Sequence, residues 1–427
     1  MDTQSPVVGP SKPRLLDVLG PGLITGASDD DPSGIATYSQ AGAQFGFALS
    51  WTLLFTYPLM AAIQEISARV GRTTGHGIAA NLRRHYPPWV ALVLIPLLFL
   101  ANTINLGADL GAMADALSLL VGGPHLLYVV VLGAVSLAAQ VFLQYTRYVS
   151  VLKWLTLSLL AYFGTVLVVK VPWGEALSGL FIPTLSADKS FWTTVVAVLG
   201  TTISPYLFFW QASQEVEDTK VNPQRDPLVK APEQAPSALA RIRLDTLVGM
   251  AFSNLVALAI LFTTAATLHA HGITDIQTTA QAAQALEPVA GRFAFTVFAL
   301  GVLGTGFLGI PALAGSAAYA LGEFRRWPTG LDRRPVEAKA FYVTLSAATV
   351  VGALVNFSPI DPISALFWSA VINGLIAVPM MALLMLMTSN PKIMGRFPVR
   401  GALRVLGWTT TVVMGVASVA FFGTWIF

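Results

Sequence analysis

Residues 20–45 read GPGLITGASDDDPSGIATYSQAGAQF, an apolar stretch of membrane-spanning length that is interrupted by three consecutive acids and a proline. A charged side chain at the centre of a bilayer costs roughly 2.5 kcal/mol or more. Pro32 lacks a backbone donor, and the residue before a proline is pushed away from helical geometry. Unwound backbone is tolerated at membrane depth only inside protein or along a water-filled cavity. The stretch therefore predicts a helix that is broken at Asp29, Asp30, Asp31, Pro32 and Ser33.

A second stretch repeats this pattern in the other half of the chain. Residues 200–215 read GTTISPYLFFWQASQE, with Pro205 in the middle of an apolar segment. Corresponding breaks in two halves of a helical bundle are typical of inverted-repeat transporters, whose substrate site lies near the bilayer midplane. The alternative for each break is a proline kink beside a structural turn. Three adjacent acids are a costly way to make a kink, so this alternative fits Pro205 better than the first break.

The composition is that of a membrane protein. Apolar residues make up 55% of the 427 residues and charged residues 11%, whereas about a quarter of a soluble domain is charged. Because about 20 apolar residues span a bilayer as a helix, we expect eleven spans. They lie near residues 18–45, 46–69, 88–120, 124–145, 149–171, 191–217, 243–269, 293–322, 340–357, 362–388 and 403–426. The longest connection, residues 218–241, is expected to be a solvated loop.

Charge placement predicts the orientation of these spans. With residues 1–17 as a cytoplasmic tail, all but three of the 25 Lys and Arg residues fall on the inner side. The exceptions are Lys170, Lys189 and Arg292. This bias is what the positive-inside rule expects. We therefore predict a multi-pass protein of the plasma membrane with a cytoplasmic N-terminus and, because the count is odd, an external C-terminus.

Other functional classes leave no trace in the sequence. The chain has no cysteine, which excludes disulfides, thiolate metal sites and iron–sulfur clusters. It shows no Walker motif and no basic stripe for nucleic acid. Its five histidines fall in expected loops or span ends without a nucleophile nearby. We expect no enzyme activity, no cofactor, no nucleic-acid ligand and no obligate protein partner, and the basic clusters at the inner helix ends suit anionic lipid.

The ordered motifs resemble those of the Nramp family of divalent metal transporters, over nearly the whole chain. Asp31-Pro32 is similar to the start of the family's Asp-Pro-Gly-Asn motif in the first helix. Further matching segments are Gly20-Pro-Gly22, Gln64–Gly71 with Thr74-Gly75, Ala108-Asp109-Leu110, Leu244-Asp-Thr246 and Met387–Gly395. The resemblance implies an all-α, LeuT-like fold with an inverted repeat of five plus five helices, helices 1 and 6 broken, and one extra C-terminal helix. The repeats would be residues 18–171 and 191–388, and the extra helix 403–426.

Several functional positions depart from the family pattern. Gly34 stands where the family has asparagine, and Ser204-Pro205-Tyr206 stands where it has Met-Pro-His. Gln211 replaces a second histidine and Ala370 a glutamine, although Asn373 remains. In the third helix Asp109 is kept and Ala112 replaces its acidic partner. The sequence is similar to the Nramp-related magnesium transporter branch, which also diverges from the metal-binding pattern.

These departures predict a site made of oxygen ligands. A methionine sulfur favours soft and borderline metals, whereas carboxylate, hydroxyl and carbonyl oxygens suit Mg²⁺, Mn²⁺ and Ca²⁺. We expect the metal site at Asp31, Thr201, Ser204 and Gly34. Gly34 and Ser204 are smaller than the asparagine and methionine of the family, so the pocket should be wide enough for a hydrated ion. Supporting or coupling residues are expected at Asp29, Asp30, Asp109, Tyr206, Gln211, Glu215 and Asn373. The alternatives are that Asp31 only caps a helix and that Ser204 only packs.

The expected function is transport of a hard divalent cation, Mg²⁺ first and Mn²⁺ second, by alternating access. Histidine is the side chain that titrates near neutral pH, and the sixth span has lost both of the family's histidines. Acids remain at Glu65, Asp109, Asp115 and Glu215, yet we expect weak or absent proton coupling. The alternative is transport of a small amine or amino acid, which the aromatic residues Tyr206, Phe208, Phe209 and Trp210 would contact through cation–π interactions. The sequence leaves the substrate, the coupling ion and the oligomeric state open.

Overall fold

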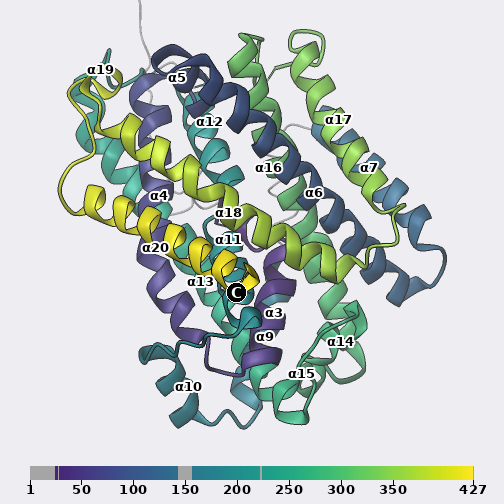
Figure 1. Ribbon diagram of the computed structural model, residues 1–427. Coiled ribbons are helices and arrows are strands. Elements are labelled where there is room, and N and C mark those ends of the chain that lie inside the picture. Colours follow the sequence, from purple (N-terminus) through teal and green to yellow (C-terminus); the bar gives the residue numbers. More distant parts are fainter. Residues whose placement is uncertain (1–24, 27, 143–155, 222–223, 332, 427) are drawn as a thin grey trace, which may run out of the picture.

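The computed structural model describes residues 25–26, 28–142, 156–221, 224–331 and 333–426. Within these ranges the regular structure is helical throughout, without strands, and the longest helices form one bundle (Figure 1). The expected tail, residues 1–17, the start of the first span and the start of the fifth lie outside the described residues. The helices of the first half are α3 (Pro32–Phe45), α4 (Ser50–Thr74), α5 (Ile78–His85), α6 (Pro88–Val121), α7 (His125–Phe142), α9 (Leu160–Val168) and α10 (Trp173–Phe181).

Several helices of the second half begin where the sequence places proline or a capping side chain. Asp361, for example, caps α18 by accepting a hydrogen bond from the Ser364 backbone nitrogen at 2.9 Å, and Pro362 occupies the first turn. These helices are α11 (Lys189–Thr202), α12 (Pro205–Val221), α13 (Ala235–Thr267), α14 (Thr279–Gln284), α15 (Glu287–Ala290), α16 (Ala294–Arg325), α17 (Lys339–Val355), α18 (Pro362–Ser389), α19 (Pro391–Met394) and α20 (Gly401–Ile426).

Seven helical segments among the described residues are long and apolar enough to cross a membrane. The eleven spans expected from the sequence are therefore met in part. Helix α4 has the necessary length but carries Glu65, Arg69 and Arg72 in its second half, and α17 has 17 residues. The expected loop at residues 218–241 is shorter than predicted, because α12 continues to Val221 and α13 begins at Ala235.

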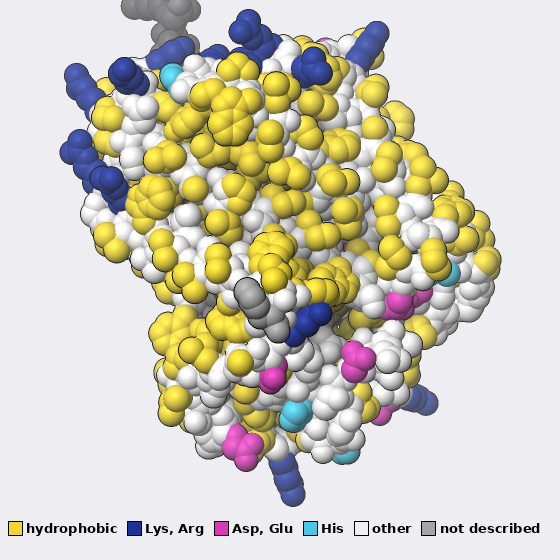
Figure 2. Space-filling model, viewed as in Figure 1, with side chains coloured by type: hydrophobic (Ala, Val, Ile, Leu, Met, Phe, Trp, Pro, Cys, Tyr) yellow, Lys and Arg dark blue, Asp and Glu magenta, His cyan; other side chains and the backbone are white. Residues whose placement is uncertain are grey.

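Charged and apolar side chains divide the surface into zones. Yellow apolar side chains cover the middle of the visible face, and Lys and Arg gather at the end that holds α5 and α19 (Figures 1 and 2). We call this the basic end. Exposed apolar residues such as Trp89, Val343 and Val419 fit a lipid-facing belt, because a water-facing surface rarely exposes so many large apolar groups.

Small residues let the helices around the two sequence breaks approach closely. A Cβ atom on Gly200 of α11 would lie 2.0 Å from the Ala370 carbonyl oxygen of α18. A Cβ atom on Gly42 of α3 would lie 2.3 Å from the Leu261 carbonyl oxygen of α13. Only glycine permits these backbone contacts, which is how membrane helices commonly pack. They fix α3 against α13 and α11 against α18, and so position the residues described next.

Candidate metal-transport site

The first sequence break coincides with a change of backbone direction. Asp29 is still helical, Asp30 forms a bend, and Asp31 is extended at φ −65° and ψ 170°. Helix α3 then begins at Pro32, whose fixed φ suits a first turn. The three acids therefore stand at an interruption of the helical backbone, and all three are buried.

One oxygen of Asp31 caps α3. Its Oδ1 accepts hydrogen bonds from the Gly34 backbone nitrogen at 2.9 Å and from Ser33 Oγ at 2.8 Å. A capping carboxylate satisfies backbone donors that the first turn of a helix leaves free. The capping role weighed from the sequence is thus present, and Ser33 supports it.

The other oxygen of Asp31 faces neighbouring helices. Its Oδ2 accepts from Asn105 Nδ2 at 3.2 Å, and the Tyr206 hydroxyl lies 3.3 Å away. The same hydroxyl lies 3.1 Å from the carbonyl oxygen of Ser28, so it can donate to either acceptor. Asp31 therefore connects α3 with α6 and α12, which a purely local cap would not do.

Asn105 of α6 is the centre of this network, and sequence reasoning missed it. Its Nδ2 also donates to Asp109 Oδ2 at 3.1 Å. Its carbonyl accepts from Asn373 Nδ2 at 2.9 Å and from Ser369 Oγ at 3.1 Å, both on α18. The side chains of Asp31, Asp109 and Asn373, all named from the sequence, are thereby connected through an amide that the sequence did not single out.

Four buried carboxylates, Asp29, Asp30, Asp31 and Asp109, meet around this interruption, and we call them the acid group. Ser253 of α13 donates to Asp29 Oδ2 at 2.6 Å and lies 3.2 Å from Asp30 Oδ1. In the described chain, Asp29 Oδ1, Asp30 Oδ2 and Asp109 Oδ1 have no hydrogen-bond partner. None of the ion pairs formed by the described residues involves these four acids. Buried carboxylates normally have basic or metal partners.

The second sequence break lies beside the first. Helix α11 ends at Thr202 and α12 begins at Pro205, with Ile203 and Ser204 between them. The Ser204 hydroxyl donates toward the carbonyl oxygens of Gly200 and Thr201, at 2.7 and 3.0 Å. It therefore satisfies the free end of α11 and keeps its lone pairs for another partner.

Gly34 lies in close contact with both interruptions. A Cβ atom there would lie 3.2 Å from the Asp29 carbonyl oxygen and 3.4 Å from Thr201 Oγ1. That Gly34 widens the site relative to asparagine stays a prediction. Within the described ranges, no three His, Asp or Glu side chains converge as a ready metal-binding cluster. A bound ion would need carbonyl, hydroxyl and water oxygens beside the carboxylates.

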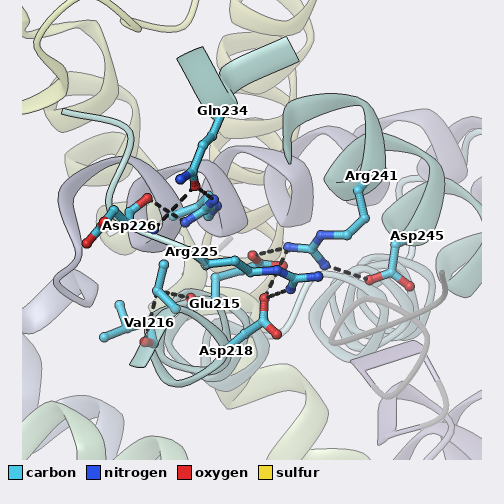
Figure 3. Close-up of polar contacts among 10 residues, drawn as sticks. Glu215, Val216, Asp218, Arg225, Asp226, Gln234, Arg241 and Asp245 are labelled. Atoms are coloured by element: carbon cyan, nitrogen blue, oxygen red, sulfur yellow. Dashed lines mark hydrogen bonds and ion pairs between the residues drawn. The ribbon is translucent and has the colours of Figure 1, made fainter. Parts of the chain in front are cut away.

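Two other residues named from the sequence lie farther along α12. Gln211 accepts a hydrogen bond from Thr25 and so contacts the segment before the first interruption. Glu215 lies nine residues beyond Tyr206, about 13 Å along the helix. It forms an ion pair with Arg241 of α13 at 2.5 Å instead of joining the acid group (Figure 3).

Glu215 belongs to an ion-pair cluster of two arginines and three acids. Arg241 points between Glu215 and Asp218 on α12 and Asp245 on its own helix, with nitrogen–oxygen distances of 2.5, 3.7 and 3.9 Å (Figure 3). Arg225 pairs with Asp218. These ion pairs join α12 to α13 and hold Arg225, in the described part of the connection, against α12.

The remaining acids and aromatic residues named from the sequence have ordinary structural partners. Glu65 pairs with Arg69 at 2.5 Å, and Asp115 lies 3.3 Å from His125 Nε2. Phe208, Phe209 and Trp210 are buried, and Trp210 packs edge-on against Tyr319. These aromatic side chains fill the core between helices, so the structure gives no support to a cation–π cage for an organic solute.

Comparisons with known proteins agree on one family. A family model described as natural resistance-associated macrophage protein-like matches residues 22–424. The divalent metal cation transporter MntH of Klebsiella pneumoniae is 28% identical over 409 residues, covering 93% of this chain and 92% of that protein. The chain also resembles the crystal structure of the Eremococcus coleocola manganese transporter, with a TM-score of 0.72 at 18% identity over 97% of this chain and 89% of that one.

A more distant structure has the same fold. Mhp1, a nucleobase-cation-symport-1 family transporter in a closed conformation, gives a TM-score of 0.57 at 16% identity and covers 95% of this chain and 93% of that one. The fold is therefore the LeuT-like fold that the sequence motifs implied. The relatives are metal transporters and not enzymes, which agrees with the expectation from the sequence.

Proposed function

The chain belongs to the Nramp family, and from this premise we propose that it carries a divalent metal ion across the membrane by alternating access. Its curated relatives are divalent metal cation transporters, and they match more than nine-tenths of the chain. We further propose that the protein has eleven spans, with the N-terminus cytoplasmic and the C-terminus outside. In this arrangement the basic end faces the cytoplasm, in keeping with the positive-inside rule.

The observation that carries the proposal is the acid group. Four buried carboxylates stand at the interruption of the backbone without a basic partner among the described residues. Such an arrangement is costly unless a cation is held there during part of the working cycle. A divalent ion would offset the charge, and its departure would restore the repulsion. The site is thereby suited to an ion that binds and then leaves.

The available ligands favour a hard ion, Mg²⁺ first and Mn²⁺ second. Asp31 Oδ2, the Thr201 carbonyl, the Ser204 hydroxyl and the backbone at Gly34 would supply oxygen ligands, and water would complete the shell. Mg²⁺ prefers oxygen and gives up its waters reluctantly. Asp29, Asp30 and Asp109 would add negative potential. Asn105 would hold Asp31 and Asp109 in position, since it donates to both.

We propose weak or absent proton coupling, with the membrane potential driving uptake. Tyr206 and Gln211 stand in the sixth span where the family pattern has histidine, and neither titrates near neutral pH. Helices α11 and α12 would form the second broken span of the inverted repeat and move relative to α3. An inside-negative potential stabilises a divalent cation inside by about 4.6 kcal/mol per 100 mV.

The test is uptake into proteoliposomes under an imposed inside-negative potential, with Mg²⁺, Mn²⁺ and Ca²⁺ supplied one at a time. We expect entry of Mg²⁺, slower entry of Mn²⁺, and no matching fall in internal pH. Asp31→Asn should reduce uptake more than about a hundredfold, because an amide keeps the helix cap but loses the charged ligand.

The matched control is Asp361→Asn. Like Asp31, Asp361 is an extended residue that caps a helix, but it is exposed and lies outside the acid group. The Asp361→Asn variant should transport Mg²⁺ at the wild-type rate. If folded wild-type protein moves no divalent ion, the metal proposal fails. Acidification of the vesicle interior in step with metal entry would overturn the proposal on proton coupling.

A further inference from the structure

A small cavity at the basic end collects positive side chains from three helices. Its volume is about 290 Å³, roughly the space of ten water molecules. It lies where α5 begins, near the end of α12 and at the last turn of α16. The charged and titratable side chains that line it are His76, Arg83, Arg84, Lys220, Glu323 and Arg326.

The positive charges of this cavity exceed the negative charge. Glu323 is its single carboxylate, and it is already engaged with the start of α5, where the Ala80 backbone nitrogen donates at 3.1 Å. A Cβ atom on Gly77 would lie 2.1 Å from Glu323 Oε1, so the carboxylate sits directly against the backbone. None of the ion pairs in the described part of the chain involves Arg83, Arg84, Lys220 or Arg326.

His76 lies among these positive side chains and is itself half-buried. Burial lowers the pKa of the His76 imidazole to about 4, and the nearby Arg84, Lys220, Arg83 and Lys230 contribute in the same direction. The histidine lies in the turn between α4 and α5, outside the membrane-spanning helices. A bound anion would oppose the field of the basic side chains.

The backbone at Arg326 is a second unusual feature of the cavity. Arg326 ends α16 in the left-handed region, with φ 63°, and is the one non-glycine residue with positive φ among the residues that the structure describes. Glycine adopts this conformation without strain and is the usual residue at such a helix end. Here the position instead places an arginine on the rim of a basic cavity.

We propose that this cavity binds a phosphate group, supplied either by the headgroup of an acidic phospholipid or by free phosphate. Arginine and lysine donate strong, charge-assisted hydrogen bonds to phosphate oxygens. Basic pockets between membrane helices on the cytoplasmic side are also suited to anionic headgroups. The site is separate from the acid group and does not depend on the identity of the transported ion.

The first experiment measures binding to the full-length protein in nanodiscs of neutral phosphatidylcholine. We expect radiolabelled inorganic phosphate to bind saturably near neutral pH. We also expect phosphate to raise the pKa of His76. NMR of ring-labelled histidine measures this pKa, and the His76→Asn variant assigns the His76 signal. In a parallel arm, phosphatidylglycerol is added to the nanodisc. If the lipid is the source, His76 is already shifted and phosphate binds weakly; if phosphate is the source, the added lipid changes neither measurement.

Arg326→Gly and Arg325→Gln form the matched pair of variants. Glycine relieves the left-handed backbone while removing a lining charge, so the variant should fold and bind phosphate about tenfold more weakly. Arg325 is exposed at the same helix end but does not line the cavity, so its variant should bind like the wild type. The proposal is overturned if neither phosphate source shifts His76 and no saturable binding occurs. It is equally overturned if Arg325→Gln weakens binding as much as Arg326→Gly.

Discussion

The acid group and the ion-pair cluster both bury carboxylates, but they treat the charges differently. In the ion-pair cluster, Glu215 is fully buried and lies 2.5 Å from Arg241. In the acid group, Asp29, Asp30 and Asp31 follow one another, and their partners among the described residues are hydroxyl, amide and backbone donors. In the ion-pair cluster every acid has a basic partner within the protein, whereas under our proposal a cation from outside would complete the acid group.

This difference separates a structural role from a transport role. A paired buried acid holds two elements together, and α12 and α13 are joined in this way across their connection. An unpaired acid destabilises the empty protein and favours the state in which a cation is bound. If the proposed function holds, the same amino-acid type stabilises one region and binds the transported ion in the other, and the presence of a basic partner within the fold decides which.

Arg241→Gln is the strongest test of the ion-pair cluster. It leaves Glu215 buried without its partner, next to Asp218 and Asp245, so we expect a loss of about 3–5 kcal/mol in the free energy of unfolding. The double variant Glu215→Gln with Arg241→Gln should recover most of this loss, because Glu215, the fully buried acid closest to Arg241, is then no longer charged. Chemical denaturation in detergent measures both changes.

Arg243→Gln is the control for this prediction. Arg243 is an exposed arginine two residues from Arg241, and the ion pairs of the described chain do not include it. Its loss should change the free energy of unfolding by less than about 0.5 kcal/mol. Equal losses from the two single variants would show that the cluster contributes no more than a surface charge.

Asp29→Asn should change the free energy of unfolding in the opposite direction when the protein is free of metal. The amide can keep the hydrogen bond from Ser253, and it removes one of three consecutive buried charges. We expect the free energy of unfolding to rise by about 1 kcal/mol, as is common when a residue serves function at the expense of stability. The same acid-to-amide change at Glu215 should lower stability, because it takes the partner away from Arg241.

The comparison fails if both amide variants shift stability in the same direction. Measuring the free energy of unfolding with and without Mg²⁺ tests the comparison more strictly. Added Mg²⁺ should stabilise wild type more than Asp29→Asn, since a ligand that binds the folded state stabilises it more at a given concentration when its affinity is higher. The ion should leave the difference between wild type and Glu215→Gln unchanged.

Sequence predicted helices best where local chemistry marks both ends. Helix α6 runs from Pro88 to Val121 and α18 from Pro362 to Ser389, within one residue of the expected spans. Proline in the first turn marks the start of both helices. The connection at residues 218–241 was predicted less well, because Arg225 and Arg241 pair there with acids that sequence spacing does not bring together.

Within the site, sequence found the charges but not the amide that connects them. Asp31 and Asp109 stand out because acids are rare in apolar helices. Asn105 bonds to Asp31, 74 positions away, and to Asn373, 268 positions away, and no local pattern records such contacts. Its one signal is its spacing of four residues from Asp109, which places both side chains on the same face of α6.

The basic cavity is the counterpart of the acid group, because its excess charge is positive. It gives the smallest of the predicted changes in stability. Burial and neighbouring cations lower the pKa of His76 to about 4, below the usual 6.5. Between these values the unfolded chain binds a proton that the folded protein does not. The free energy of unfolding should therefore fall as the pH drops from about 6.5 to 4 in phosphate-free neutral lipid. His76→Asn should remove this part of the pH dependence while leaving the stability above pH 7 close to that of the wild type. Because the imidazole is half-buried, we expect a smaller effect than at Glu215 or Asp29, and an unchanged pH profile in the variant would show that His76 does not sense the basic side chains around it.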